Sequence, residues 1–400
     1  MRFSEIAGET GIFVDGDWIE KKDQDAKGAV RLIQLADVGP GEFRDKSDRH
    51  ITVEKADELH CTFLRKGDIL IARLGDPLCK ACVFPLDGLY ITAVDVAILR
   101  IGSDVVNPKY LIYLLNSPWF KDQVKQYESG TTRKRISRKN LDRIEMIFPP
   151  LPEQERIVSR IEELFSQLDA GVETLKKTKA QLSVYRQAAI TEAFSVENNT
   201  PNVCLSDIAQ IIGGITKGRD LSGTETIELP YLRVANVQNG YLDLSEIKTI
   251  KLRVDEKERY LLKPGDVLYT EGGDRDKLGR GTVWRGEIKD CVHQNHVFKA
   301  RVDQSKAIPE YVAFWSMSTP ARNYFYQKGK QSVNLASINK TVLSALTLPL
   351  PALEKQREII NHIESRLSVC DSIEQTVDTA LQQAEAMRQS ILKDAFEGRL

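Results

Sequence analysis

The sequence predicts an α+β protein in which two similar globular α/β regions are separated by two long helices. Two observations carry this prediction. A segment at 151–194 with helical periodicity recurs at 353–396, and a region of short strand-like runs precedes each copy. A duplication of this length gives a molecule two similar halves. With 400 residues and 42% hydrophobic content, the chain is large enough to form more than one core.

The duplicated segment can be followed residue by residue at a constant offset of 202. The residues of the first copy that recur are Gln154, Ile157, Ile161, Glu162, Asp169, Arg186, Gln187, Ala193 and Phe194. Their counterparts are Gln356, Ile359, Ile363, Glu364, Asp371, Arg388, Gln389, Ala395 and Phe396.

Both copies are expected to form helices. In the first copy apolar residues recur mostly every three or four positions from Ile157 to Ala193, which is the spacing of a coiled-coil seam. Prolines precede each copy, and Pro201 follows the first. About 42 residues would give a helix of roughly 63 Å. Because a narrow apolar stripe on so long a helix needs a partner, we expect an antiparallel coiled coil with pseudo-twofold symmetry.

The globular regions repeat more weakly. Residues 66–70 parallel 264–268, and residues 107–110 parallel 308–311, with offsets that drift between 198 and 202. Drifting offsets are expected where loops differ in length. We therefore predict a first domain at 1–150, a first long helix at 151–196, a second domain at 197–350 and a second long helix at 351–400.

The composition limits which classes of protein this chain can belong to. The net charge is −1, so any nucleic-acid surface must be a local patch. No apolar run approaches the length that spans a bilayer, and the first residues lack the apolar core of a secretion signal. The six cysteines are scattered, which favours a reducing cytoplasm over a disulfide scaffold.

This duplicated order resembles the specificity subunit of type I restriction–modification enzymes over the whole chain. The pieces that carry the resemblance are the opening of the first helix at 148–158, the close of the second at 395–400 and the Gly-Asp turns of both domains. The opening of the second helix departs from the pattern, because it loses the double proline and gains Lys355. That departure leaves the start of this helix open by a residue or two.

The resemblance implies a non-catalytic DNA-binding subunit. Each globular region would be a target recognition domain that reads one half of a split, asymmetric DNA sequence, and the helices would act as spacer and scaffold. The expected partners are double-stranded DNA, two copies of a modification (methyltransferase) subunit and a restriction (translocase–nuclease) subunit. S-adenosylmethionine and ATP would bind to those partners, with no cofactor on this chain.

The sharpest candidate for DNA contact is the stretch 130–140, where five of the seven residues from 133 to 139 are basic. Lysine and arginine neutralise phosphates, and arginine also pairs with guanine. The alternative is a solvated helix start capped by Thr131 or Thr132. The candidates in this region are Thr132, Arg133, Lys134, Arg135, Arg138 and Lys139, with Arg73 in a shorter loop.

The second domain has three candidate stretches. The glycine-rich stretch 271–281 could approach DNA or be an ordinary long hairpin. The stretch 329–334 offers amides that suit adenine edges, and 214–219 is as consistent with solvation as with phosphate contact. The candidates are Arg275, Lys277 and Arg280, then Lys330, Gln331 and Asn334, then Lys217 and Arg219.

The helices kept register while the domains diverged, so their residues are expected to fit each other and identical partner subunits. The candidates for partner contact are Arg156, Arg186, Gln187, Phe194, Arg357, Arg388, Gln389 and Phe396.

Two rival functions remain open. The chain could be a DNA adenine methyltransferase, since Asn116-Ser117-Pro118-Trp119 superficially resembles the motif of those enzymes, although a capped helix start explains it better. It could also be a coiled-coil adaptor that binds only proteins. No cofactor or nucleotide loop is recognisable, and Cys79 with Cys82 lacks the second pair of a zinc site, so we expect no catalytic residue and no metal.

Overall fold

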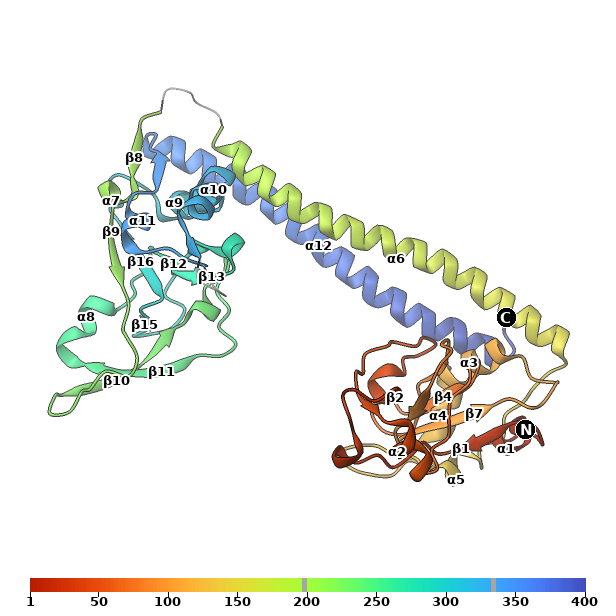
Figure 1. The fold of residues 1–400 in the computed structure, drawn as a ribbon. Helices are drawn as coiled ribbons and strands as arrows, with labels where there is room; N and C mark the ends of the chain where they lie inside the picture. The colour runs from red at the N-terminus through yellow and green to blue at the C-terminus, as the bar shows by residue number, and fades with distance from the viewer. Residues whose placement is uncertain (196–199, 332–335) are drawn as a thin grey trace. The chain divides into compact units, whose positions relative to one another are not determined.

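The computed structural model describes residues 1–195, 200–331 and 336–400. These residues form two compact units, each of which contains part of both long helices (Figure 1). Unit 1 comprises Met1–Leu175 and Thr379–Leu400, and unit 2 comprises Lys176–Asp378. The prediction of mixed α/β regions with two long helices is confirmed.

Unit 1 combines two small sheets with a cluster of helices. Its strands are β1 (Ile12–Val14), β2 (Val30–Ile33), β3 (His50–Ile51), β4 (Ile69–Ala72), β5 (Ala81–Val83), β6 (Tyr90–Thr92) and β7 (Val96–Arg100). Its helices are α1 (Phe3–Ala7), α2 (Val53–Glu58), α3 (Pro108–Asn116), α4 (Pro118–Lys125), α5 (Arg138–Leu141) and the first part of α6 (Leu151–Ala193). The sheets have the orders β1-β7-β4-β5, all antiparallel, and β3-β2-β6, in which β2 and β6 are parallel.

Unit 2 repeats this topology with additions. Its strands are β8 (Asn202–Cys204), β9 (Ala209–Gly213), β10 (Thr226–Leu232), β11 (Lys248–Arg253), β12 (Asp266–Thr270), β13 (Gly272–Gly273), β14 (Gly281–Val283), β15 (Val292–His293), β16 (Val297–Val302), β17 (Lys330–Gln331), β18 (Ala336–Ser337) and β19 (Thr347–Pro349). Its helices are α7 (Leu205–Ile208), α8 (Lys257–Tyr260), α9 (Pro309–Met317), α10 (Thr319–Lys328), α11 (Lys340–Ser344) and most of α12 (Leu353–Phe396).

The sheet orders of unit 2 match those of unit 1 strand for strand. The order β9-β16-β12-β14 corresponds to β1-β7-β4-β5, and β11-β10-β15, with β10 and β15 parallel, corresponds to β3-β2-β6. The shared Gly-Asp turn shows why the motif recurs: Gly67 and Gly265 both have a positive φ, of 94° and 92°. The following buried aspartates, Asp68 and Asp266, pair with Arg100 and Arg301 on the neighbouring strand at 2.7 Å and 2.8 Å. The motif is therefore structural.

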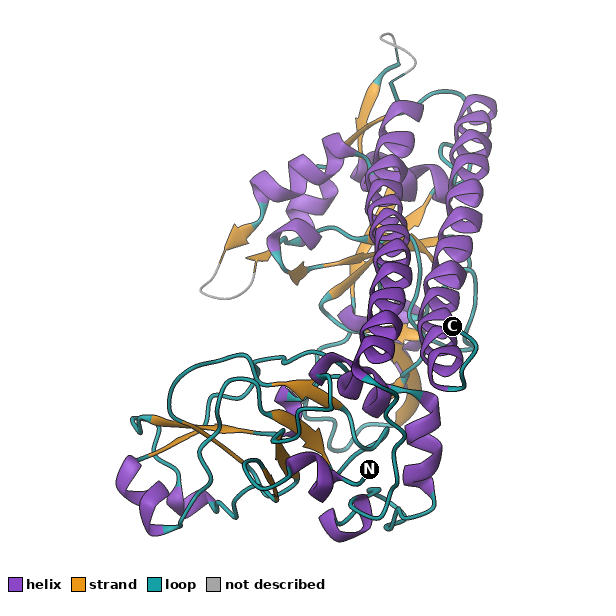
Figure 2. Ribbon diagram, turned by 90° about the vertical axis from the view of Figure 1, so that its right-hand side faces the viewer, coloured by secondary structure: helices purple, strands orange, loops and turns teal. Residues whose placement is uncertain are grey.

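Within each unit the two long helices lie side by side (Figure 2), and their ion pairs show that they run antiparallel. In unit 1 the beginning of α6 lies against the end of α12: Arg388 pairs with Asp169, and Arg156 Nη2 donates to Leu400 O at 3.0 Å. In unit 2 the end of α6 lies against the beginning of α12: Arg186 pairs with Asp371 at 2.6 Å, and Arg366 with Glu192 at 2.6 Å.

Each core includes residues of the helices. In unit 1 Ile157, Val158 and Ile161 of α6 pack with Leu392 and Ala395 of α12 against the first sheet and α3. In unit 2 Ile360 belongs to the corresponding core, and Ile190, Ala193 and Ile363 form a smaller cluster beside it. Each compact unit takes in segments of both long helices from distant parts of the sequence, and the division into four consecutive parts stays a prediction.

Candidate nucleic-acid interface

The basic segment of unit 1, residues 133–139, is joined by backbone contacts to the loop that follows β4. Arg135 forms isolated bridges with Leu74 and Ser129, and Ile136 N donates to Arg73 O at 3.0 Å. Helix α5 begins only at Arg138, and its cap is Ser137, whose Oγ accepts from Asn140 N at 3.1 Å. The alternative helix start at Thr131 or Thr132 is therefore wrong.

Three of the five cations in the basic segment are paired with carboxylates from elsewhere in the unit. The pairs are Lys134 with Glu128 at 3.2 Å, Arg135 with Asp95 at 2.7 Å, and Arg138 with Asp15 at 3.3 Å. Arg138 Nη1 also donates to Phe13 O at 3.1 Å, and its guanidinium lies 5.8 Å from the centre of the Phe13 ring. These contacts fix the direction of the segment and partly neutralise it.

The other two cations, Arg133 and Lys139, extend into solvent. Both are exposed, and neither has an ion-pair partner among the residues that the structure describes. Thr132, next to Arg133, is also exposed. Arg133 and Lys139 are thus the predicted residues of unit 1 that are best placed to contact phosphate groups.

The prediction of Arg73 as a DNA-contacting residue is corrected by the structure, because its side chain is buried. Its side chain is 6% exposed and lies 2.9 Å from Asp15 Oδ1, an ion pair without hydrogen-bond geometry. It donates to the backbone oxygens of Ile136, at 3.3 Å, and Val94, at 2.5 Å. Burial lowers the pKa of the guanidinium and the Asp15 carboxylate opposes this, but an arginine stays charged in proteins. Arg73 supports the basic segment from inside and offers no surface to DNA in this structure.

The loop of unit 2 that connects β12 to β14 contains three of the predicted cations. Arg275 stacks over the Tyr326 ring at 4.3 Å and donates to Tyr326 O at 3.2 Å. Lys277 pairs with Asp274, and Arg280 Nη1 donates to Gln238 Oε1 at 3.0 Å. Strands β12 and β14 pair directly, so the loop connects the two strands of a hairpin. The loop itself contains the two-residue strand β13 and a 3₁₀ turn.

The remaining predictions for unit 2 have different outcomes. Lys330 is exposed at the start of β17, and Gln331 follows it in the same strand, whereas Asn334 lies outside the described residues. Lys217 is exposed over the ring of the buried Tyr231, at 5.4 Å. Arg219 makes two hydrogen bonds of 2.9 Å to Glu256, so its guanidinium is already held by a carboxylate.

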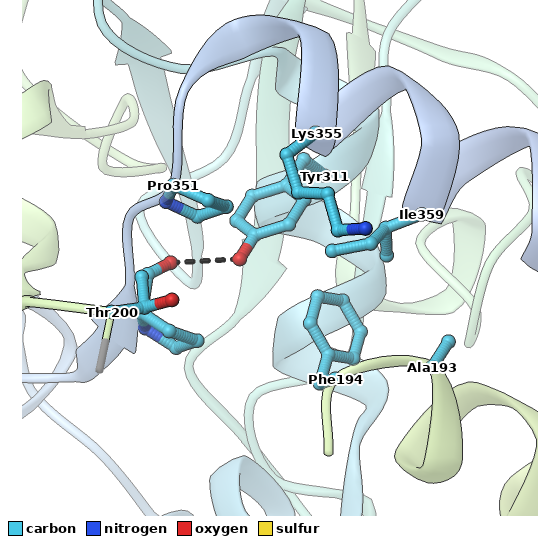
Figure 3. Close-up of a pocket in the computed structure, with 8 residues that line it drawn as sticks. Ala193, Phe194, Thr200, Tyr311, Pro351, Lys355 and Ile359 are labelled. Carbon is cyan, nitrogen blue, oxygen red and sulfur yellow. Dashed lines mark hydrogen bonds between the residues drawn. The ribbon is translucent and has the colours of Figure 1, made fainter. Parts of the chain in front are cut away.

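Several recurring helix residues that were predicted to contact partners also make contacts inside the chain, and their contact with partners stays a prediction. Phe194 lies edge-on to Tyr311, beside Ile359 (Figure 3). It also lies edge-on to Trp315. Phe396 lies edge-on to Tyr110 in the same manner. The small cavity beside Phe194 has a volume of only about 20 Å³, so it is a packing gap and no ligand site.

The arginines and one glutamine follow the same rule. Arg186 and Arg388 form the interhelical ion pairs described above. Gln187 donates to Met317 O at 2.8 Å and accepts from Arg322 at 2.7 Å. Arg156 pairs with Glu153 and reaches Leu400. Arg357 and Gln389 are exposed and remain candidates for partner contact. For the others, packing within the chain accounts for their recurrence.

Gln154, Gln356, Asp15 and Asp95 were not among the residues predicted from the sequence to have a functional role. The glutamines recur in the duplicated segment, which was the available signal, but their burial was not visible in it. Asp15 and Asp95 gave no signal, because each lies far in sequence from the cation that it pairs with.

The motifs considered for metal binding or catalysis have structural roles. Cys79 and Cys82 are buried, and burial raises their pKa values to about 11 and about 12, so both thiols stay protonated. Within the described ranges, no group of three or more His, Cys, Asp or Glu side chains could hold a metal ion. Ser117 caps α4 by accepting from Phe120 N at 3.2 Å, which accounts for the Asn-Ser-Pro-Trp stretch. Among the described helices none is both long and apolar enough to cross a membrane.

The sequence matches a known protein family in two copies. The model of the type I restriction modification DNA specificity domain matches residues 11–183 and again 198–383. The StySPI specificity subunit of Salmonella potsdam is 26% identical over 74% of this chain and 66% of its own length. The EcoKI specificity subunit of Escherichia coli K12 is 25% identical over 73% and 65%. The matches thus span just under two thirds of these relatives.

Two solved structures share the fold. One, from work on complex assembly and conformational transition of the type I R-M system, has a TM-score of 0.68 at 18% identity and covers 100% of this chain and 97% of its own. The HsdS subunit from Thermoanaerobacter tengcongensis has a TM-score of 0.51 at 17% identity, with coverage of 100% and 96%. Since the family model matches most of the sequence in two copies, the chain belongs to the type I restriction modification DNA specificity family.

Proposed function

We propose that this chain is the non-catalytic subunit that selects the DNA sequence for a type I restriction–modification complex. The observation that carries the proposal is the duplicated topology with different charged loops at matching positions. The basic segment of unit 1 bridges to the loop that follows β4, and the pair β4 and β7 corresponds to β12 and β16 of unit 2. Two similar folds with unlike surface loops suit the reading of two unlike half-sites.

The helices would act as spacer and scaffold in this proposal. The pairs Asp169–Arg388 and Arg186–Asp371 join recurring residues in exchanged order, which supports an antiparallel coiled coil with pseudo-twofold symmetry. Two half-sites that are read from the same side of the duplex lie one helical turn apart, which is about 34–36 Å. A rigid connection between two reading units would favour one spacing between the half-sites, and therefore a split target.

The proposed partners follow from the duplication. The two copies of the helical segment would offer two similar positions for docking two modification subunits, and a restriction subunit would complete the assembly. S-adenosylmethionine and ATP would be bound by those partners. The mass of the complex formed with the modification subunit tests this arrangement, and a complex with a single modification subunit as the sole species would contradict it.

Mapping of methylated adenines across the host genome, with and without this chain, tests the function itself. We expect a split, asymmetric motif that loses its methylation when the chain is deleted and regains it on complementation. A motif that persists without the chain would count against the proposal. S-adenosylmethionine binding by the isolated chain would instead favour a methyltransferase.

A further inference from the structure

Asp15 lies between two arginines of unit 1. Its Oδ1 is 2.9 Å from the buried Arg73, and its Oδ2 is 3.3 Å from Arg138 of the basic segment. Asp15 directly follows β1, whereas Arg138 begins α5 more than a hundred residues later. One carboxylate therefore ties the basic segment to the edge of the first sheet.

Asp95 makes a second tie of the same kind. It precedes β7, its Oδ1 is 2.7 Å from Arg135 Nη2, and its backbone oxygen accepts from Arg73 N at 2.8 Å. The Asp95 side chain is 22% exposed and that of Arg135 is 49% exposed. Releasing an exposed arginine from a half-buried carboxylate costs little free energy, because surface ion pairs contribute only about 0–1 kcal/mol.

We propose that Asp15 and Asp95 are positioning residues of the DNA interface, which hold Arg138 and Arg135 in place and withhold these two cations from DNA of arbitrary sequence. The inference rests on the proposed function. Arg133 and Lys139 remain available for first contact with phosphates. Arg135 and Arg138 then exchange a carboxylate for a phosphate only where the DNA fits the surface.

The physical basis is competition between anions for the same guanidinium. A carboxylate and a phosphate both accept paired hydrogen bonds from arginine. Each additional cation that neutralises a phosphate releases counterions and steepens the fall of affinity with salt by about 0.9 in the logarithmic slope. A tethered cation contributes less to this sequence-independent term, so the tethers raise the ratio of specific to non-specific binding.

Unit 2 uses a different arrangement at the matching position. Glu271 stands where unit 1 has Arg73, because Glu271 N donates to His296 O and Ile338 N donates to Glu271 O, as Arg73 does with Asp95 and Ile136. The Glu271 carboxylate is 2.6 Å from His296 Nδ1. An acidic residue thus stands where unit 1 has Arg73 and a histidine where it has Asp95, so among the described residues of unit 2 this position holds no arginine tethered in the same way.

The test compares Asp95→Asn and Asp15→Asn with Asp87→Asn in the full chain. Asp87 pairs with Lys66 at 3.4 Å, at the opposite end of β4 from Arg73, so its substitution changes the net charge equally without touching the basic segment. Binding to random-sequence DNA duplexes is measured by fluorescence anisotropy over a range of sodium chloride concentrations. Selection from the same random pool, followed by sequencing, measures specificity.

We expect Asp95→Asn to raise affinity for random duplexes roughly threefold to tenfold at low salt and to steepen the salt slope by about 0.9 relative to Asp87→Asn. Sequence enrichment should fall at the same time. Adding Arg135→Ala to Asp95→Asn should abolish the gain, since the released cation is removed. Asp15→Asn should act likewise through Arg138. If Asp15→Asn does not fold because buried Arg73 has lost its ion-pair partner, Asp95→Asn still tests the inference.

Equal affinities and slopes for Asp95→Asn and Asp87→Asn would overturn the inference while leaving the proposed function intact. A merely structural role would lower binding to all DNA and would also overturn it. If the unaltered chain bound no duplex at any salt concentration, the proposed function would fail together with the inference.

Discussion

Gln154 and Gln356 occupy matching positions in the two units and make the same three hydrogen bonds. Gln154 donates to Val105 O and Pro149 O and accepts from Asn107 N. Gln356 donates to Lys306 O and Pro351 O and accepts from Ile308 N. Both side chains are fully buried. Each glutamine holds the beginning of a long helix to the segment that leads into α3 in unit 1 and into α9 in unit 2.

Replacing either glutamine by alanine should destabilise its own unit. Gln154→Ala leaves one backbone N–H and two backbone oxygens without their partner, and unsatisfied buried groups cost about 1–3 kcal/mol each. We expect faster hydrogen exchange in peptides of unit 1 for Gln154→Ala and in unit 2 for Gln356→Ala. Gln167→Ala, at an exposed position of α6, is the matched control. Equal exchange in all three variants would contradict the assigned role.

The interhelical ion pairs predict a charge-swap result. Arg388 pairs with Asp169 and lies 4.5 Å from the centre of the Phe165 ring. Asp169→Arg and Arg388→Asp should each lower stability by about 1 kcal/mol, because an exposed attraction becomes a repulsion of similar size. The double swap should recover part of this loss in urea unfolding. Glu173→Arg, at another exposed position of α6, supplies the control for a change of charge alone. No recovery in the double variant would exclude a direct pairing.

Periodic and duplicated features could be predicted from the sequence, since they depend on local spacing. The helices appear as α6 and α12, and the Gly-Asp turns recur because each aspartate pairs with an arginine of the neighbouring strand. The parallel pairing of β2 with β6 brings Arg31 next to Tyr90. No local sequence pattern predicts a contact between residues so far apart in the sequence.

The candidate site shows the same limit in its charges. A count of basic residues found the segment 133–139 but could not separate Arg133, which is exposed and without an ion-pair partner in the described ranges, from Arg135, which is held by Asp95. Arg73 was misassigned because its burial depends on Asp15, which follows β1, and on Asp95, which precedes β7. Recurrence in the helices was also ambiguous. Phe194 and Phe396 recur since each fills a similar aromatic cluster inside its own unit.

The exposed cations of unit 1 predict a change in salt dependence. Arg133→Ala with Lys139→Ala should weaken DNA binding and reduce the logarithmic salt slope by about 1.8, because up to two phosphate contacts are lost. Fluorescence anisotropy with duplex DNA measures both quantities. Lys21→Ala with Lys27→Ala removes the same charge from exposed positions of unit 1 and should change the slope less. Identical slopes for the two double variants would exclude Arg133 and Lys139 as the contacting pair.

The buried His293 predicts an acid-sensitive unit 2. Burial lowers its pKa from 6.5 to about 4, and its Nδ1 lies 2.6 Å from Val297 O. The unfolded chain takes up a proton below about pH 6.5 while the folded unit does so only near pH 4. Stability should therefore be undiminished above pH 6.5, fall as the pH drops through this window, and lose on the order of 3 kcal/mol by pH 4.

Unit 1 supplies the matched variant, because Thr92 stands at the position of His293 and donates to Val96 O at 3.4 Å. His293→Thr should remove the acid sensitivity between pH 6.5 and 4, at a constant cost for the smaller side chain. In a background with Trp18→Phe and Trp119→Phe, the remaining tryptophans, Trp284 and Trp315, report urea unfolding of unit 2 alone. The same pH dependence in His293→Thr would place the acid sensitivity elsewhere, because threonine does not titrate in this range.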